Sequence, residues 1–560
     1  MSIAIKTVPV VVLCALIVAV PSIWASWVQD GVALCTATGN QNYPMIAPDG
    51  AGGAIVTWMD SRSGNYDVYA QRLKSGAVQW AADGVALCTA AGGQSSPTIA
   101  SDGSGGAIVT WHDYRGGNWD IYAQRMNASG AIQWAENGVA LCKAAGDQQF
   151  PQIISDGAGG AIVAWTDNRS VGSDIYAQKV DASGAVKWTA GGVALCAAAL
   201  EQANPRIASD GSGGAVVAWQ DLRGEGDPRI YTQSVDASGA IRWPEDGIDI
   251  CTAAGEQRNP TIVGDGAGGA IVAWLDGRAW GAYHIYAQRV DASGAIRWTA
   301  NGAAICTAGG SQDSPMVTTD DAGGAIVTWS DGRLGENWNI FSQRVDASGT
   351  VQWRTDGVPI CMAPGRQESP QITSDGAGGA IITWPDFRIW LDIYAQKVSA
   401  SGAVQWTVDG VAVCAAVDDQ QYPQITSDGS NGAIITWGDY RNGSDRDIYA
   451  QKVDANGFVP LTDADAPAVS VELRQNYPNP FNPVTTVAYS IAAKCEVTLE
   501  IYDASGKCLA RLVDKQQEKG SYAVQWNGKD ERGSRAASGI YFYRLTAGGR
   551  TIAKKMVLLR

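Results

Sequence analysis

A segment of about 54 residues occurs eight times along the chain, and this repeat restricts the possible folds more than any other feature. Most copies contain a form of W-x-x-D-G-V-A-L-C. The Cys of this segment stands at Cys35, Cys88, Cys142, Cys196, Cys251, Cys306, Cys361 and Cys414. The successive intervals are 53, 54, 54, 55, 55, 55 and 53 residues. A period of this size is typical of proteins in which each copy forms one supersecondary unit.

Each copy contains four short apolar stretches. In the third copy they are FPQIISDG, AGGAIVAWTDNR, SDIYAQKVDASG and AVKW followed by GGVALC. They are rich in Ile, Val, Trp and Tyr and are bounded by Gly, Asp, Asn or Ser, which indicates strands joined by tight turns. No stretch has a helical period. The chain is therefore expected to be all-β, with four strands in each copy.

Eight copies of four strands predict an eight-bladed β-propeller, because a ring of small sheets buries both faces of each sheet and exposes little strand edge. The eighth copy runs into FVPLTDADAP without its own W-x-x-D-G-V-A-L-C segment, and Trp27–Cys35 supplies that segment near the start of the chain. We expect this N-terminal strand to complete the eighth blade and close the ring. An open stack of repeats is the alternative.

Two resemblances support the propeller. The order P-x-I-x-S-D-G, I-V-x-W-x-D-x-R and D-I-Y resembles the blade motif of TolB-type propellers, although the Pro of S-P-D-G is missing. The arm Y-A-Q-R-V-D-A-S-G-A-I-Q-W is similar to the tryptophan-docking motif of quinoprotein-type propellers, which also have eight blades. Both resemblances concern the fold and not an activity.

Residues 1–25 have the layout of a signal peptide, with Lys6, an apolar run over 8–20 and small residues before Ser26. No later segment is long and apolar enough to span a bilayer, so we expect an exported protein with no transmembrane segment in its mature form. The formal net charge of -15 argues against nucleic acid as a partner. The expected divisions are a signal peptide (1–25), the propeller (26–460), a linker (461–472) and a C-terminal domain (473–560).

The C-terminal domain begins with LRQNYPNPFNPVTTVAYSI at Leu473 and ends in KKMVLLR. It resembles the type A sorting domain of the type IX secretion system, and its middle part is similar to the immunoglobulin-like domain of FlgD hook-capping proteins. Its alternating strands fit a small β-sandwich. The resemblance implies that the outer-membrane secretion machinery is a partner and that the protein is secreted or held on the outer surface of a diderm bacterium. An ordinary structural sandwich is the alternative.

Residues that recur in all copies are interpreted as structural. The eight Cys are expected to be small buried thiols, and no cluster of ligands indicates a metal site. A disulfide between Cys495 and Cys508 is left open. Asp and Arg stand two residues apart in every W-x-D-x-R, which predicts a repeated ion pair. The Gln of Q-x-x-P is expected to satisfy backbone groups of the loop between blades.

The candidate binding residues lie in the loop that carries nearly all of the length variation between copies, between W-x-D-x-R and the next strand. With the loop between blades, it is expected on one face, and the D-G-x-G-G and D-A-S-G turns on the other. Aromatic side chains on loops of a rigid scaffold can bind a sugar or a peptide, although packing between blades is the alternative. The candidates are Tyr66, Trp119, Trp280, Tyr283, Trp338 and Trp390.

The sequence assigns no catalytic residue, metal ligand or cofactor. The two His, His112 and His284, stand at different positions of their copies, which leaves no Ser-His-Asp set. A pair of glycosidase carboxylates is not readable from spacing. We expect a cell-surface or secreted propeller that binds an extracellular glycan or protein or has a structural role. The alternative is a secreted carbohydrate-active enzyme, a glycosidase or lyase, with its site on the variable-loop face.

Overall fold

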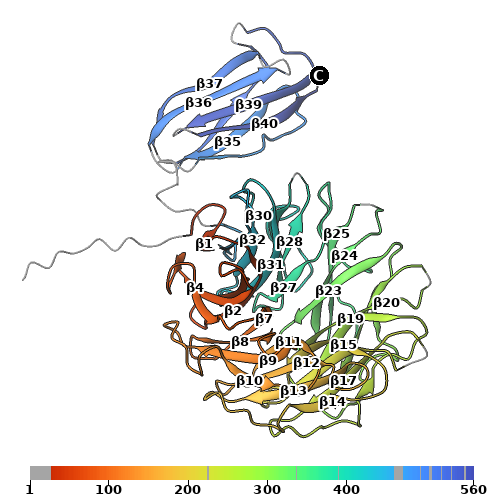
Figure 1. Ribbon diagram of the computed structural model, residues 1–560. Helices are drawn as coiled ribbons and strands as arrows, with labels where there is room; N and C mark the ends of the chain where they lie inside the picture. The colour runs from red at the N-terminus through yellow and green to blue at the C-terminus, as the bar shows by residue number, and fades with distance from the viewer. Residues whose placement is uncertain are drawn as a thin grey trace, which may run out of the picture.

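A computed structural model describes residues 27–223, 226–279, 281–335, 337–388, 390–459, 471–491, 494–503, 507–518, 520–530, 533–547 and 550–559. These residues form strands, turns and loops, and eight sheets of the same plan are arranged in a ring (Figure 1). The chain is thus all-β, and the predicted eight-bladed propeller is confirmed. No helix in the described parts of the chain is long and apolar enough to cross a membrane.

The innermost strand of each blade begins at or just after the Q-x-x-P motif. These strands contact one another around the ring, including the contact between the first and the eighth that closes it. They are β2 (Gln41–Pro48), β7 (Gln94–Ser101), β11 (Gln148–Ser155), β15 (Gln202–Ser209), β19 (Gln257–Gly264), β23 (Gln312–Thr319), β27 (Gln371–Ser374) and β31 (Gln420–Ser427).

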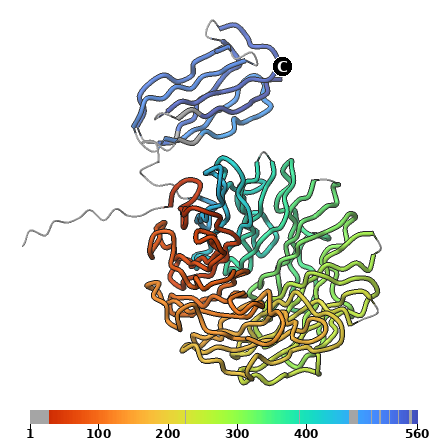
Figure 2. Tube along the Cα trace, in the orientation of Figure 1, coloured from red at the N-terminus to blue at the C-terminus, as the bar shows by residue number. Residues whose placement is uncertain are grey.

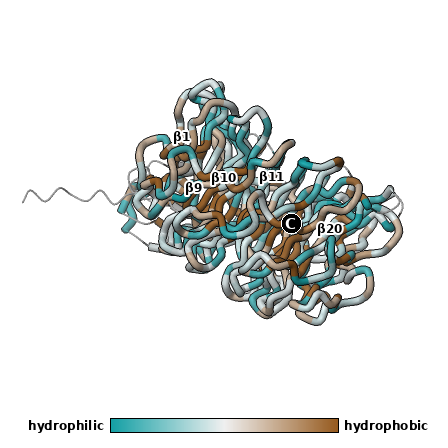
Figure 3. The backbone as a smooth tube through the Cα atoms, turned by 60° about the horizontal axis from the view of Figure 1, so that its bottom comes forward, coloured by the Kyte–Doolittle hydropathy of each residue, from teal (hydrophilic) through white to brown (hydrophobic). Residues whose placement is uncertain are grey.

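The second strand of each blade carries the apolar run that ends in W-x-D. Both of its faces are covered by neighbouring blades, so almost every residue is buried, which explains why the run does not alternate with polar residues. These strands are β3 (Ala54–Asp60), β8 (Ala107–Asp113), β12 (Ala161–Asp167), β16 (Ala215–Asp221), β20 (Ala270–Asp276), β24 (Ala325–Asp331), β28 (Ala380–Asp386) and β32 (Ala433–Asp439). Figure 3 shows the hydrophobic stretches of the chain inside, with hydrophilic loops around them.

The third strand of each blade begins after the variable loop. These strands are β4 (Asp67–Lys74), β9 (Asp120–Met126), β13 (Asp174–Val180), β17 (Arg229–Val235), β21 (His284–Val290), β25 (Asn339–Val345), β29 (Asp392–Val398) and β33 (Asp447–Val453). The outer strands carry the Cys segment and, in the first blade, are preceded by β5 (Ala77–Val78). They are β6 (Val85–Cys88), β10 (Val139–Cys142), β14 (Val193–Cys196), β18 (Ile248–Asp249), β22 (Ala303–Cys306), β26 (Val358–Cys361), β30 (Val411–Cys414) and β1 (Val32–Cys35).

Strand β1 closes the ring as predicted. It pairs antiparallel with β33, with Val32 opposite Ala450, so the start of the propeller lies beside its end (Figure 2). The side-chain amide of Gln451 donates to the Val28 carbonyl at 2.6 Å. Gly31 has a φ of 93°, and a Cβ there would come within 2.6 Å of the Trp437 ring, so glycine is required where the strand crosses this side chain.

The outer Trp of a blade joins it to the next blade. The Trp134 indole N–H donates to the Ala182 carbonyl in the following D-A-S-G turn at 3.1 Å, and the same bond recurs around the ring. Gly184 lies against the Trp134 ring, where a Cβ would approach to 2.8 Å. This contact explains why the turn and the Trp recur together in the sequence.

The C-terminal residues form a separate β-sandwich with its own core, which includes Tyr489, Trp526 and Tyr543. One sheet contains β34 (Val471–Leu473), β35 (Thr485–Ile491) and β38 (Gly520–Trp526). The other contains β36 (Cys495–Asp503), β37 (Cys508–Gln517), β39 (Gly539–Ala547) and β40 (Arg550–Leu558). No disulfide joins Cys495 and Cys508.

Candidate ligand-binding site

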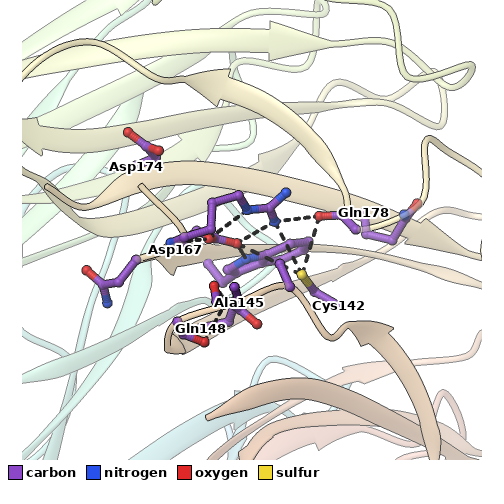
Figure 4. A network of polar contacts seen from close by, with 12 residues as sticks. Cys142, Ala145, Gln148, Asp167, Asp174 and Gln178 are labelled. Atoms are coloured by element: carbon purple, nitrogen blue, oxygen red, sulfur yellow. Dashed lines mark hydrogen bonds and ion pairs between the residues drawn. The ribbon is translucent and has the colours of Figure 1, made fainter. Parts of the chain in front are cut away.

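The residues that repeat eight times form a structural clamp. In the third blade the Asp167 carboxylate accepts from the Trp165 indole at 2.8 Å and from Arg169 Nε and Nη2 at 2.8 and 2.6 Å. Arg169 Nη2 also donates to Cys142 Sγ at 3.3 Å and to the Gly191 carbonyl at 2.7 Å, and Figure 4 shows Asp167 and Cys142 in this network. The ion pair recurs in all eight blades, which confirms the structural interpretation.

The eight Cys of the repeat are buried thiols, as predicted. Burial raises the pKa of Cys35 and Cys88 to about 12, so these thiols stay protonated at neutral pH and are poor nucleophiles. The Gln of Q-x-x-P has its expected role in seven of the eight blades: the Gln41 side-chain amide, for instance, donates to the carbonyls of Ala37 and Gly39, at 3.0 and 2.8 Å. Gln367 makes no such bond among the described residues.

The residue before the Pro of Q-x-x-P has an unusual backbone conformation in every blade. Its φ lies between 49° and 56°, in the left-handed region, and the strand register shifts beside it in seven of the eight blades. Non-glycine residues rarely adopt this conformation, and such strain is concentrated at functional sites. The residues are Tyr43, Ser96, Phe150, Asn204, Asn259, Ser314, Ser369 and Tyr422.

These eight residues stand at equivalent positions near the start of the innermost strands, and they differ in kind. Three are aromatic and are about half exposed: Tyr43 at 51%, Phe150 at 52% and Tyr422 at 44%. The Tyr43 and Tyr422 rings lie side by side, with centroids 5.1 Å apart. The other five are Ser or Asn. The backbone conformation is therefore the same in all eight blades, whereas the aromatic side chains occur in only the first, third and eighth.

A pocket of about 340 Å³ lies between the first, seventh and eighth blades. Tyr43, Tyr422, Phe387 and Leu391 supply apolar walls, and Gln371, Gln421, Gln424 and Glu368 are among its polar residues. Phe387 is 42% exposed. We call Tyr43, Phe150, Phe387 and Tyr422 the aromatic mouth.

Neighbouring side chains hold the aromatic mouth in place. The Arg446 guanidinium lies 5.1 Å from the Tyr422 ring centroid and donates to the Tyr440 hydroxyl at 2.6 Å, to Gln421 Oε1 at 3.1 Å and to Asn42 Oδ1. In the second blade His112 Nδ1 accepts from the Phe150 backbone N–H at 3.3 Å. Burial lowers the pKa of His112 to about 4, so the imidazole is neutral and able to accept this bond. Such supports reduce the cost of ordering the rings when a ligand binds.

A second cavity, of about 800 Å³, is lined mainly by residues of the innermost strands. The residue after each Pro lines this cavity. These residues are Met45, Thr98, Gln152, Arg206, Thr261, Met316, Gln371 and Gln424. Tyr43 and Phe150 line the same cavity. It thus combines two aromatic rings with amide and hydroxyl groups and one guanidinium, and no carboxylate is among the described residues that line it.

The structure places the residues singled out from the sequence in the variable loops of different blades. These loops lie beside the loops between blades, as predicted: the Tyr66 carbonyl accepts from Gln94 N at 2.7 Å. The Tyr66 hydroxyl accepts from Asn42 Nδ2 at 3.1 Å. Trp119 packs on His112, with ring centroids 4.5 Å apart. The Tyr283 hydroxyl donates to the Glu256 carboxylate.

Trp338 is half-buried, and Trp390 is 67% exposed beside a cavity of about 450 Å³ that also contacts Tyr440. Trp280 lies outside the described residues. Among the five described candidates, no ring contact joins one to another. Their role in binding remains a prediction, because each lies in the loop of its own blade.

Sequence reasoning missed the aromatic mouth, although a signal was present. The position before the Pro reads Tyr, Ser, Phe, Asn, Asn, Ser, Ser and Tyr in the eight copies, whereas the Gln and the Pro of the motif are constant. Variation between two constant residues indicates positions that the blade itself does not require. Its exposure depends on the left-handed conformation and the register shift, which the sequence pattern does not reveal.

In comparisons with known proteins, residues 484–550 match the FlgD Ig-like domain. No curated protein matches the chain. Among solved structures, it is similar to an α-L-arabinanase of Penicillium chrysogenum complexed with arabinobiose, with 13% identity, 57% of this chain and 98% of that chain covered and a TM-score of 0.30. It is also similar to an ulvan lyase bound to a sugar fragment, with 11% identity, 68% of this chain and 96% of that chain covered and a TM-score of 0.39.

A third similar structure is PorZ, a surface component of the type-IX secretion system of Porphyromonas gingivalis, with 12% identity, 95% of this chain and 85% of that chain covered and a TM-score of 0.22. At these identities and TM-scores the three structures carry no inference about what this chain binds or does. Among the described residues, no group of three His, Cys, Asp or Glu side chains could hold a metal ion.

Proposed function

We propose that this chain is an exported propeller that binds an extracellular glycan at the aromatic mouth of its channel. One observation carries the proposal. At a position repeated in every blade and held in a strained conformation, three copies expose an aromatic ring. The eight Trp of the second strands, in contrast, are completely buried. Large exposed aromatic side chains grouped at a cavity are typical of recognition surfaces.

A glycan fits the chemistry of the mouth. The C–H groups on one face of a sugar ring can pack against the electron-rich face of an aromatic ring. Sugar hydroxyls can exchange hydrogen bonds with the amides of Gln371, Gln421 and Gln424, which line the pocket. Small-molecule sites are usually lined by apolar side chains with a few polar groups among them. An extracellular protein ligand is the competing outcome of the test below.

The observation supports binding over glycoside hydrolysis. A glycosidase of the usual type needs two carboxyl groups on opposite sides of the bond it cleaves. Glu368 is the one carboxylate among the described residues that line the pocket of the mouth, and it is ion-paired with Arg366 at 2.7 Å. The larger cavity has no lining Asp or Glu among the described residues.

The binding proposal is tested with a glycan array. We expect the full chain to bind a subset of glycans and the Tyr43→Ala, Tyr422→Ala double variant to lose at least about ten-fold in affinity, because each ring of a binding centre can contribute 1 kcal/mol or more. Phe458→Ala is the matched control, since Phe458 is 59% exposed but follows the turn Asp454–Gly457 on the other face. An equal loss of affinity in the control and in the double variant would contradict the proposal. Binding of an extracellular protein but of no glycan would also contradict it.

We also propose that the C-terminal domain directs export through the type IX secretion system, which places the propeller outside the cell. The immunoglobulin-like match over 484–550 and the sequence from Leu473 to the chain end support this. In a bacterium that has this system, deletion of 473–560 is expected to leave the propeller in the periplasm. Secretion of the truncated chain at the normal level would refute the sorting role. Removal of residues 1–25 should retain the chain in the cytoplasm.

A further inference from the structure

Arg206 is the one charged residue in the ring of side chains that follow the Pro of each innermost strand. It belongs to β15, and the equivalent residues in other blades are Met, Thr or Gln. Because the eight backbones are equivalent, the blade itself does not require a charge at this place. A cationic side chain that occurs in one blade of eight therefore indicates a role in ligand binding within the cavity.

The charge of Arg206 is uncompensated. Among the described residues it has no ion pair, and its guanidinium makes a single long hydrogen bond, from Nη1 to the Pro205 carbonyl at 3.5 Å. Most other arginines in the described part of the propeller are ion-paired: Arg72, for instance, donates to Asp49 at 2.6 Å. The Arg206 side chain is nevertheless exposed, and it lines the cavity, so the guanidinium is accessible to a ligand. Packing of the blade does not account for this charge, because no described residue pairs with it.

We propose that Arg206 binds the anionic substituent, carboxylate or sulfate, of an acidic oligosaccharide held in the channel cavity. This inference rests on the proposed function and names its ligand class. A guanidinium forms paired, charge-assisted hydrogen bonds with a carboxylate or sulfate, which neutral amides do not. No lining carboxylate among the described residues competes for it.

The other residues of the cavity fit the same ligand. Tyr43 and Phe150 offer ring faces to sugars, while Gln152, Thr98 and Thr261 offer neutral hydrogen-bonding groups. The volume of about 800 Å³ lies within the range of small-ligand sites. A peptide with acidic side chains has the charge but lacks the repeated hydroxyls that these groups match. The formal net charge of -15 gives no general attraction for anions, so recognition must be local.

The test is calorimetric titration of the full chain with four probes: tetragalacturonate, its fully methyl-esterified and therefore uncharged form, a sulfated carrageenan tetrasaccharide and a tetra-aspartate peptide. We expect at least one charged sugar to bind about ten-fold or more tightly than the uncharged ester, as a charge-assisted hydrogen bond predicts. Preference for tetragalacturonate identifies a carboxylate as the anion, and preference for carrageenan identifies a sulfate.

Two variants of Arg206 decide the outcome. Arg206→Gln, which installs the residue of three other blades, should abolish the preference for the charged sugar and leave binding of the uncharged ester unchanged. Arg206→Lys should keep part of the preference. The thermal midpoint of Arg206→Gln should stay close to that of the native chain, which shows that the variant folds.

Three results would overturn the inference. Equal binding of charged and uncharged sugars, unaffected by Arg206→Gln, would refute it and leave the proposed glycan function intact. Binding of the peptide alone, dependent on Arg206, would refute the oligosaccharide as ligand. Binding of none of the probes, together with a blank glycan array, would refute both the inference and the proposed function.

Discussion

At the scale of the residue, the propeller contains buried acidic side chains of two opposite kinds. Asp386 is ion-paired with Arg388 at 2.7 Å and accepts from the Trp384 indole at 2.9 Å. Asp392, its partner across the strand pair, is also buried. Burial, reinforced by the charge of Asp386 and opposed by Arg388, raises the pKa of Asp392 to about 6. A carboxylate can therefore stabilise or destabilise the same blade, depending on its partner.

We expect Asp392→Asn to raise the free energy of unfolding at neutral pH by about 1–2 kcal/mol. The folded-state pKa lies above the value of about 3.9 in an unfolded chain, so the stabilising contribution of the protonated group is fully present below about pH 4 and is lost as pH rises through 6. The gain should therefore grow between about pH 4 and 6 and stay constant above. Blade six already carries Asn339 at this position.

Urea denaturation at several pH values measures this gain. Asp386→Asn is the matched comparison and should lower the free energy of unfolding by about 3–5 kcal/mol, because it leaves the Arg388 guanidinium without its ion-pair partner. If Asp392→Asn is destabilising at neutral pH, or if its effect does not depend on pH, the explanation from burial is wrong.

At the scale of the element, the blade plan was readable from the sequence and the binding surface was not. The number of strands, the buried W-x-D strand and the closing role of Trp27–Cys35 follow from periodicity and from the missing last segment, because sheet formation and burial impose these patterns. Three of the four rings of the mouth depend instead on a residue with a left-handed backbone. The candidates Trp119 and Tyr283 were chosen for loop variability, and each contacts a residue of the adjoining structure, His112 and Glu256.

At the scale of the whole molecule, eightfold repetition separates structure from function. The Asp-Arg-Cys clamp of every blade and the Trp docking between seven pairs of adjacent blades hold the ring together. Features that occur in a few blades, such as the aromatic mouth and Arg206, break the symmetry on one end of the channel and within it. A rigid ring with a one-sided mouth can bind a ligand in a single orientation, which a fully symmetric mouth could not.

Hydrogen–deuterium exchange of the full chain, with and without the glycan that binds best on the array, tests the central claim most directly. The account predicts increased protection in the innermost-strand segments that carry Tyr43, Phe150 and Tyr422 of the mouth, 41–48, 148–155 and 420–427, and no change in the D-A-S-G turns of the other face. Protection confined to those turns, or to the C-terminal sandwich, would show that the ligand binds elsewhere and would contradict the account.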